Sequence, residues 1–180
     1  MRLAAPFAFF TLTLVLWGPL PALAGEGEQA ISASAGYANL ALPQTADDGS
    51  DTEIGIHGGM AQVDYERGLS DTFAIRGSLG GGVYDGPVGL AYSGAAIADV
   101  IYRFDILRYV PYFFGGLGVV TGFGDGVDTR FAPVVELGGG LEILESRDFS
   151  WGLEFKGAAF PTQARYVTIG ARLSWRWGYF

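Results

Sequence analysis

The chain has 180 residues, with 19 acidic and 11 basic side chains and a formal net charge of −8 at pH 7. This acidic balance provides no electrostatic footprint for nucleic acid, and the lack of cysteine excludes disulfides and a lipid-modified cysteine. Almost half of the residues are hydrophobic, and 29 are glycine, 13 Phe, 9 Tyr and 4 Trp. This mixture suits neither a helical bundle nor a disordered chain, and it favours many strands with closely spaced backbones.

The first 24 residues predict a secretory signal peptide. Arg2 forms a short basic start, an apolar stretch covers about residues 3–17, and two prolines end it. An Ala-Leu-Ala sequence then provides the small-x-small pattern for cleavage after Ala24. The alternative, an uncleaved membrane anchor, fits the prolines and this pattern less well. Residues 25–180 are expected to form one domain, in which no apolar run is long enough for a membrane helix.

Two weak strand patterns, at about 29–42 and 53–66, open the predicted domain. In the second, the apolar residue Ile56 and the charged residue Asp64 both occupy even positions. The apolar positions of this strand are therefore expected to change from even to odd between them. A glycine bulge near Gly58 and the glycine after it would explain the change.

The connection between these strands and the only histidine are candidates for chemistry. The connection carries closely spaced carboxylates that could bind Ca²⁺, but the spacing does not match an EF-hand, and we predict a solvated acidic loop. His57 lies near the expected outer end of the second strand, where a lipid-modifying enzyme could place its site. Such an enzyme needs a paired nucleophile and base, which the neighbouring residues do not provide. We therefore predict no catalytic residue, metal site or cofactor. The four carboxylates are Asp47, Asp48, Asp51 and Glu53.

The third and fourth strands alternate strictly between apolar and polar residues, as a strand with two different faces does. The third sets Phe73, Ile75, Leu79 and Val83 against Arg76, Ser78 and Gly80. The fourth, at about 88–104, has apolar, aromatic or glycine residues at all even positions, while its odd positions include Ser93, Asp99 and Arg103.

The last four strands follow the same rule with one exception. The fifth, at about 109–120, is apolar on both parities, so its faces stay unassigned. The sixth sets Phe131, Val135, Leu137, Leu141 and Ile143 against Glu136, Gly138, Gly140 and Glu142, and the seventh sets Phe149, Trp151, Leu153 and Phe155 against Ser150, Glu154 and Lys156. In the eighth, Val167, Ile169, Ala171, Leu173, Trp175, Trp177 and Tyr179 alternate with Thr168, Gly170, Arg172, Ser174, Arg176 and Gly178.

These patterns predict an all-β fold, an eight-stranded antiparallel up-and-down transmembrane β-barrel. Short turns alternate with more variable loops, which places both termini on the periplasmic side. The alternative is a soluble lipocalin-like barrel, whose apolar parity would point inward. The polar parity is rich in glycine and serine, which fits a narrow lumen better than a soluble surface. The strands also exceed the roughly 9–11 residues that a tilted strand needs to cross a bilayer.

Aromatic residues at the strand ends are predicted to form two membrane-interface girdles. The girdle near the tight turns and the C-terminus contains Tyr65, Phe73, Tyr102, Phe104, Tyr109, Phe149, Trp151, Trp175 and Trp177. The girdle at the opposite rim contains Tyr37, Tyr84, Tyr92, Phe131, Phe160 and Tyr166.

The charged residues of the polar parity are predicted to pair inside the lumen. An arginine turned to lipid near the midplane costs about 2–4 kcal/mol, so the lumen is its cheaper location. A lumen filled by salt bridges is the favoured interpretation, and a selectivity or gating network is the alternative. The acids are Asp64, Asp99, Glu136, Glu142 and Glu154, and the bases are Arg76, Arg103, Lys156, Arg172 and Arg176.

The chain resembles the small eight-stranded outer-membrane barrels of the OmpA, OmpX and opacity type. The likeness is carried by YERGLSDTFAIRGSLG (65–80), RYVPYFFGGLGVV (108–120), PVVELGGGLEI (133–143) and the terminal aromatic strand. It implies insertion by the outer-membrane assembly machinery, which reads a final aromatic residue. Phe180 provides that residue, but it lies one position out of phase with the lipid-facing residues of the last strand. Tyr179 is in phase with them.

The expected function is a structural or surface-interaction role in the outer membrane, without catalysis. The expected partners are outer-membrane lipid, lipopolysaccharide and the assembly machinery, with no nucleic acid. We expect a monomer, because a closed barrel has no edge that needs a partner. A narrow pore for small solutes and, less favoured, a lipid A-modifying enzyme are the alternatives.

Overall fold

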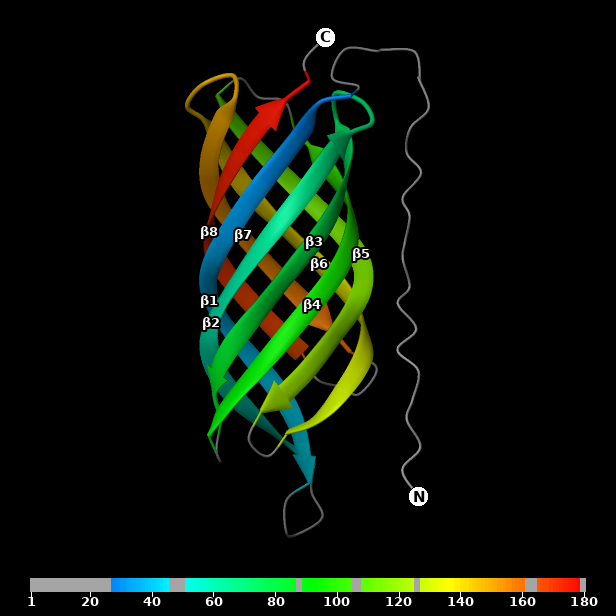
Figure 1. Ribbon diagram of the computed structural model, residues 1–180, viewed down its shortest axis with the longest axis vertical. Helices are drawn as coiled ribbons and strands as arrows, with labels where there is room; N and C mark the ends of the chain where they lie inside the picture. The colour runs from blue at the N-terminus through cyan, green and yellow to red at the C-terminus, as the bar shows by residue number, and fades with distance from the viewer. Residues whose placement is uncertain are drawn as a thin grey trace, which may run out of the picture.

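The protein is a closed barrel of eight antiparallel strands (Figure 1). The computed structural model describes residues 27–45, 51–86, 89–104, 108–124, 127–160 and 165–178. Each strand pairs with its neighbours in the chain, and β8 closes the barrel on β1. The strands are β1 (Gln29–Thr45), β2 (Asp51–Gly68), β3 (Phe73–Asp85), β4 (Leu90–Arg103), β5 (Tyr109–Gly124), β6 (Val127–Leu144), β7 (Phe149–Ala159) and β8 (Arg165–Trp177).

This architecture confirms the predicted all-β up-and-down barrel. Across the described residues the structure contains no helix that is long and apolar enough to cross a membrane. The predicted signal peptide, residues 1–24, and the predicted assembly signal, Tyr179 and Phe180, lie outside the described residues, as do Asp47 and Asp48 of the acidic connection.

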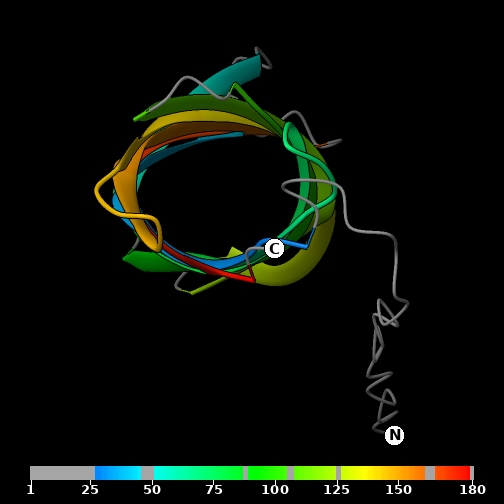
Figure 2. The ribbon, with the colours of Figure 1, turned by 90° about the horizontal axis from the view of Figure 1, so that it is seen from above.

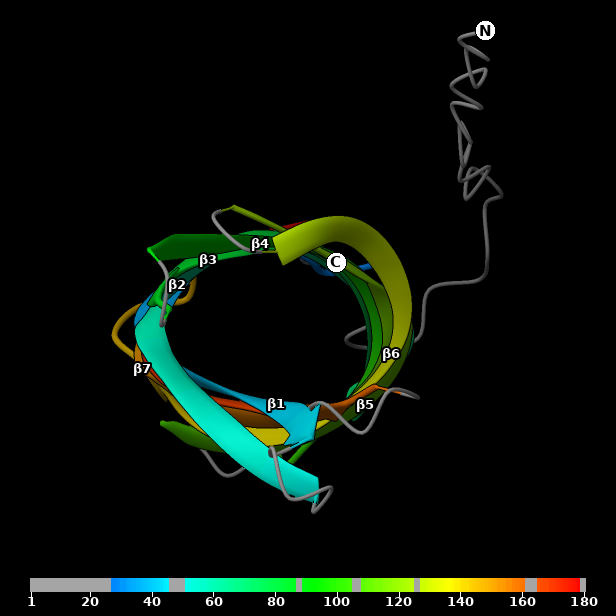
Figure 3. The same ribbon diagram turned by 90° about the horizontal axis from the view of Figure 1, so that it is seen from below.

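The two ends of the barrel differ in their connections (Figures 2 and 3). We call one the turn end, because the short connections 69–72 and 145–148 lie there, together with the start of β1 and the end of β8. The opposite loop end holds the tips of the β1–β2 and β5–β6 hairpins. Seen from either end, the strands form one ring around a single lumen.

The outer face of the barrel is apolar and the lumen is polar. In β8, Leu173 and Trp175 are 54% and 59% exposed, whereas Arg172 and Ser174 between them are 1% and 2% exposed. A water-soluble barrel would show the reverse, with charged side chains outside. The lipocalin-like orientation therefore does not describe this chain.

The predicted glycine bulge in β2 is wrong. The pairing of β1 with β2 runs without a shift through Tyr37↔Gly59 and Ala38↔Gly58. Ile56 is 4% exposed and points into the lumen, on the same face as Asp64. The strand therefore keeps one phase along its whole length. Its inward residues are apolar near the loop end because the lumen is itself apolar there. There Ile56 packs against Ala38, Tyr84 and Ala91. The pairing of β5 with β6 does shift, between Gly122 and Gly124.

Two hairpins continue past the wall of the barrel at the loop end (Figure 1). The β1–β2 pairing extends to Thr45↔Asp51, although β1 meets β8 only as far as Ala41↔Arg165. The β5–β6 pairing extends to Gly124↔Val127, whereas β6 meets β7 only from Val135↔Ala159 onward. The β1–β2 hairpin is therefore a two-stranded ribbon at its tip. In the described part of the β5–β6 hairpin only the β6 edge is unpaired, because β5 stays paired with β4 as far as Ala91↔Gly124.

Candidate functional site

The candidate site is the polar filling of the lumen, to which six strands contribute the predicted charged residues. β2 carries Asp64, β3 carries Arg76, and β4 carries Asp99 and Arg103. All ten lie on the inner face, and all except the half-buried Arg103 are buried. The remaining six are Glu136 and Glu142 on β6, Glu154 and Lys156 on β7, and Arg172 and Arg176 on β8.

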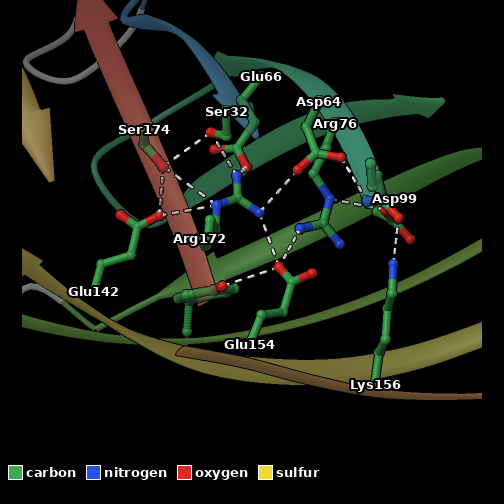
Figure 4. A network of polar contacts seen from close by, with 12 residues as sticks. Ser32, Asp64, Glu66, Arg76, Asp99, Glu142, Glu154, Lys156, Arg172 and Ser174 are labelled. Carbon is green, nitrogen blue, oxygen red and sulfur yellow. Dashed lines mark hydrogen bonds and ion pairs between the residues drawn. The ribbon is translucent and has the colours of Figure 1, made fainter. Parts of the chain in front are cut away.

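Arg172 is the centre of this filling (Figure 4). Its guanidinium group is 2.8 Å from Glu154, 3.2 Å from Asp64 and 3.2 Å from Glu142, and it also pairs with Glu66. These four carboxylates come from β2, β6 and β7, so one side chain of β8 spans the lumen. The planar guanidinium fork suits this role, because it presents five donors in fixed directions.

A second arginine extends the filling toward β4. Arg76 donates from Nε to Asp99 at 2.9 Å and from Nη1 to Glu154 at 2.9 Å. Its guanidinium carbon lies 3.9 Å from the ring centroid of Phe114, a cation–π contact. The Tyr112 hydroxyl also donates to Glu154, at 2.9 Å. One carboxylate of β7 thus serves two arginines and a tyrosine.

The filling continues toward both ends of the lumen. At the turn end, Arg103 pairs with Glu66 and Arg176 pairs with Glu142. On the loop side, Lys156 lies 3.8 Å from Glu136. Further contacts on the loop side join Lys156 to Gln62, Gln62 to Asp64, and Tyr166 to Glu136.

Little space is left between these side chains. A cavity of about 10 Å³ lies beside Glu154 and Lys156, lined also by Ser34, Met60 and Thr168. This is room for about one water molecule. The middle of the lumen is therefore filled by side chains.

The sequence prediction missed several members of the filling. Glu66 was findable, because it shares the parity of Asp64 on the same strand. Tyr112 and Phe114 were not, because β5 is apolar on both faces. The strand register explains their position, since Tyr112 lies opposite Gly140 and Phe114 opposite Gly138. A side chain in place of either glycine would collide with the facing ring, so the glycine run makes room for two aromatic residues inside the lumen.

The aromatic residues predicted at the turn end lie mostly on the outer face. Phe73, Tyr102 and Phe104 form edge-to-face contacts with centroid distances of 5.1 and 4.9 Å. Phe149 and Trp177 are half-buried. The other members of this girdle, all exposed, are Tyr65, Tyr109, Trp151 and Trp175.

The predicted opposite girdle is wrong for half of its members. Tyr84 is 6% exposed and packs in the lumen, and Tyr166 donates to Glu136 inside the barrel. Phe160 packs beside Tyr166 against the same lumen residues. These rings fill the loop end of the lumen, which is lined by apolar residues. Tyr37, Tyr92 and Phe131 are exposed on the outer face.

Neither a metal centre nor a catalytic pair emerges from the geometry of the described part of the chain. No group of three or more His, Asp or Glu side chains is placed there to hold a metal ion. His57 is on the outer face, where its Nδ1 accepts a hydrogen bond from Asn39 at 2.9 Å and contacts the Tyr37 hydroxyl. Neither neighbour is the serine or carboxylate partner that a nucleophilic site requires.

Comparison with known proteins supports the fold. No protein-family model matches the chain, and no curated protein is similar to it in sequence. Similar solved structures include neisserial surface protein A, at 13% identity and a TM-score of 0.66, over 83% of this chain and 99% of that one. The N-terminal β-barrel domain of Pseudomonas aeruginosa OprF has 16% identity and a TM-score of 0.54, over 85% and 99%. The Yersinia pestis attachment invasion locus protein Ail has 16% identity and a TM-score of 0.52, over 84% and 99%.

Proposed function

We propose that this chain, which has the fold of the small eight-stranded outer-membrane β-barrels, is an integral outer-membrane protein with a structural or surface-interaction role. The apolar outer face supports the location. From Val167 to Trp177, the outward residues of β8 span ten residue-to-residue steps of strand. At about 3.3 Å per residue and a tilt of about 40°, this is an apolar band about 25 Å tall. That height matches the apolar band of outer-membrane barrels.

The observation that carries the proposed role is the position of Arg172, which pairs with carboxylates of β2, β6 and β7 at the same time. A side chain tied to three strands across the lumen blocks a solute path and braces the wall. The narrow pore is therefore the weaker alternative, since eight strands enclose an interior just wide enough for side chains.

The projecting hairpins favour a surface-interaction role. The tips of β1–β2 and β5–β6 extend beyond the wall at the loop end, which faces the cell exterior in the proposed orientation. The edges of β1 and β2 at the first tip, and the β6 edge at the second, have no strand partner there among the described residues and present backbone groups to other molecules. The attachment role in the name of the Yersinia barrel fits this use of the fold.

The proposal also includes the processing, insertion, partners and monomeric state that the sequence led us to expect. The chain would be inserted by the outer-membrane assembly machinery after cleavage near Ala24, contact lipid and lipopolysaccharide, act as a monomer and perform no catalysis.

A heat-modifiability gel on urea-washed outer membranes, followed by conductance recording in planar bilayers, tests the proposal. We expect the unheated protein to stay with the membrane and to migrate differently from the boiled protein. We expect no conductance steps from the inserted protein. A soluble periplasmic protein without a mobility shift would overturn the membrane location, and regular conductance steps would replace the structural role with the pore.

A further inference from the structure

The charges that fill the lumen do not balance. Among the side chains that the structure describes, the filling contains six carboxylates but five basic groups, and Glu28 at the turn-end mouth adds a further acid. A buried charge without compensation is costly, and such groups become neutral or acquire a partner. The lumen therefore favours one additional positive charge. The six acids are Asp64, Glu66, Asp99, Glu136, Glu142 and Glu154, and the five bases are Arg76, Arg103, Lys156, Arg172 and Arg176.

Glu136 is the least compensated of these carboxylates. The other five each lie within 3.2 Å of an arginine nitrogen. Among the described residues, the one ion-pair partner of Glu136 is Lys156, at 3.8 Å, which is too far for a hydrogen bond. Tyr166 donates to Glu136 Oε2, but Glu136 Oε1 has no hydrogen-bond partner in the described part of the chain.

Asp99 provides an acceptor on the other side of a glycine. Gly116 of β5 is the strand partner of Asp99 on one side and of Glu136 on the other. A Cβ at Gly116 would collide with Asp99 Oδ1, so the Asp99 carboxylate lies over this glycine, on the side of β6. Asp99 Oδ2 accepts from Arg76 (Figure 4), whereas Oδ1 has no partner among the described residues. Two unpartnered oxygens, on side chains that are 3% and 0% exposed, thus flank one glycine.

A proton fits this position better than a metal ion. Two ionised carboxylates that face each other repel, whereas one proton between them replaces the repulsion with a charge-assisted hydrogen bond. Across the described residues, no group of three or more His, Asp or Glu side chains is placed to hold a metal ion. A proton also needs no added volume in a lumen that side chains already fill.

We propose that Glu136 and Asp99 form a buried proton-binding site, in which the Glu136 carboxyl is protonated at neutral pH and donates from Oε1 to Asp99 Oδ1 across Gly116. The proton balances the excess carboxylate of the lumen. Its loss at alkaline pH leaves two ionised carboxylates beside each other and weakens the filling. This inference goes beyond the proposed function and does not depend on it, because it concerns the lumen alone.

The groups around the pair allow one proton and not two ionised acids. The titratable side chains that act on the pair are Arg76 on β3, Asp64 on β2, Lys156 on β7 and Tyr166 on β8, while β5 contributes Gly116. Arg76 also serves Glu154, so the two neighbouring cations meet three carboxylates. One proton on Glu136 restores the balance and leaves Asp99 paired with Arg76.

Urea unfolding in detergent at a series of pH values tests the site. A glutamate in the unfolded chain has a pKa of about 4.3. Above about pH 5, the folded protein would therefore hold one proton that the unfolded chain has released. Unfolding then releases this proton, so the unfolding equilibrium constant should rise about tenfold per pH unit. Stability should fall as the pH rises, until the folded protein itself loses the proton.

Glu136→Gln is the diagnostic variant. Glutamine keeps the length of the side chain, accepts from Tyr166 and donates from its amide toward Asp99, but it has no proton to lose. This variant should refold and should lack the tenfold rise per pH unit. Glu142→Gln is the matched control, because Glu142 is a buried, inward glutamate of the same strand, six residues away and paired with arginines. It should unfold at a lower urea concentration and keep the pH dependence of the wild type. An unchanged pH dependence in Glu136→Gln would overturn the site.

Infrared spectroscopy detects the proton directly. At neutral pH, the wild type should show the C=O stretching band of a protonated carboxyl group, shifted in D₂O. Glu142→Gln should keep this band and Glu136→Gln should lose it. If Glu136→Gln does not refold, Asp99→Asn replaces it, because Glu136 can then ionise beside Lys156 and the band should again be lost.

Two results with wild-type protein alone would overturn the proposal. One is the lack of a protonated-carboxyl band at neutral pH. The other is stability that does not change with pH but rises with Na⁺ or K⁺ at constant ionic strength, which would show that a cation balances the lumen.

Discussion

Arg172 Nη1 on β8 and Glu154 Oε2 on β7 are joined at 2.8 Å in the middle of the lumen, and both side chains are buried. The pair is held from both sides, because Glu154 also accepts from Arg76 and Arg172 also pairs with the β2 carboxylates. Removing either charge would leave several opposite charges unpaired in a space that water hardly enters.

Arg172→Met should therefore destabilise the barrel strongly. Removing one partner of a buried ion pair costs about 3–5 kcal/mol, because the other charge is left uncompensated. Urea unfolding in detergent measures the change. Arg108→Met is the control, because the exposed Arg108–Glu145 pair at 3.2 Å is worth at most about 1 kcal/mol. Equal unfolding midpoints for the two variants would show that the central pairs do not hold the barrel together.

The face of each strand could be read from the sequence wherever charge and bulk alternate. β8 alternates in this way, so both Arg172 and Leu173 were assigned to the faces on which they lie. β5 does not, because Tyr112 and Phe114 are as large and apolar as their outward neighbours. In β2 the same logic failed at Ile56, since an apolar residue was assumed to point outward while the loop end of the lumen is itself apolar.

The pairing of charges could not be read in the same way. Parity shows that Arg172 and Glu142 face inward, but not that they meet. Their meeting depends on the stagger between strands as the barrel closes, which places Arg172 opposite Gly152 and Gly152 opposite Glu142. Glycine between two charged residues leaves the space in which their side chains touch.

Phe114→Leu tests the aromatic part of the filling. We expect a loss of about 2 kcal/mol in the free energy of unfolding, from the cation–π contact with Arg76 and the space left by the ring. Phe113→Leu is the matched control, because Phe113 is the adjacent ring of β5 and points outward, 61% exposed. Urea unfolding in detergent compares the two variants. A larger loss for Phe113→Leu than for Phe114→Leu would contradict the assignment of the faces of β5.

Gly138→Ala tests why a glycine run interrupts β6. A Cβ at this position would meet the Phe114 ring, the Phe155 carbonyl oxygen and the Lys156 side chain. Overpacking of this kind costs about 1–3 kcal/mol, and we expect a lower unfolding midpoint or a lower refolding yield on the heat-modifiability gel. Gly77→Ala should be neutral or slightly stabilising, because its Cβ would have no atom within 4 Å. Equal behaviour of the two alanine variants would mean that the Phe114 ring moves aside without loss.

Leu173→Arg tests which face of the barrel meets lipid. Leu173 is 54% exposed on the outer face, in the middle of the apolar band of β8. In a bilayer, an arginine there should lower the free energy of unfolding by about 2–4 kcal/mol. Leu69→Arg is the control, because Leu69 is 45% exposed but lies in the turn 69–72, outside the band. Refolding into liposomes should therefore be lost or slowed for Leu173→Arg only. Both variants should fold alike in detergent micelles, whose thin and deformable apolar layer lets an arginine reach water. If Leu173→Arg refolds into liposomes as readily as Leu69→Arg, the outer face is not in contact with hydrocarbon. That result would contradict the proposed membrane location.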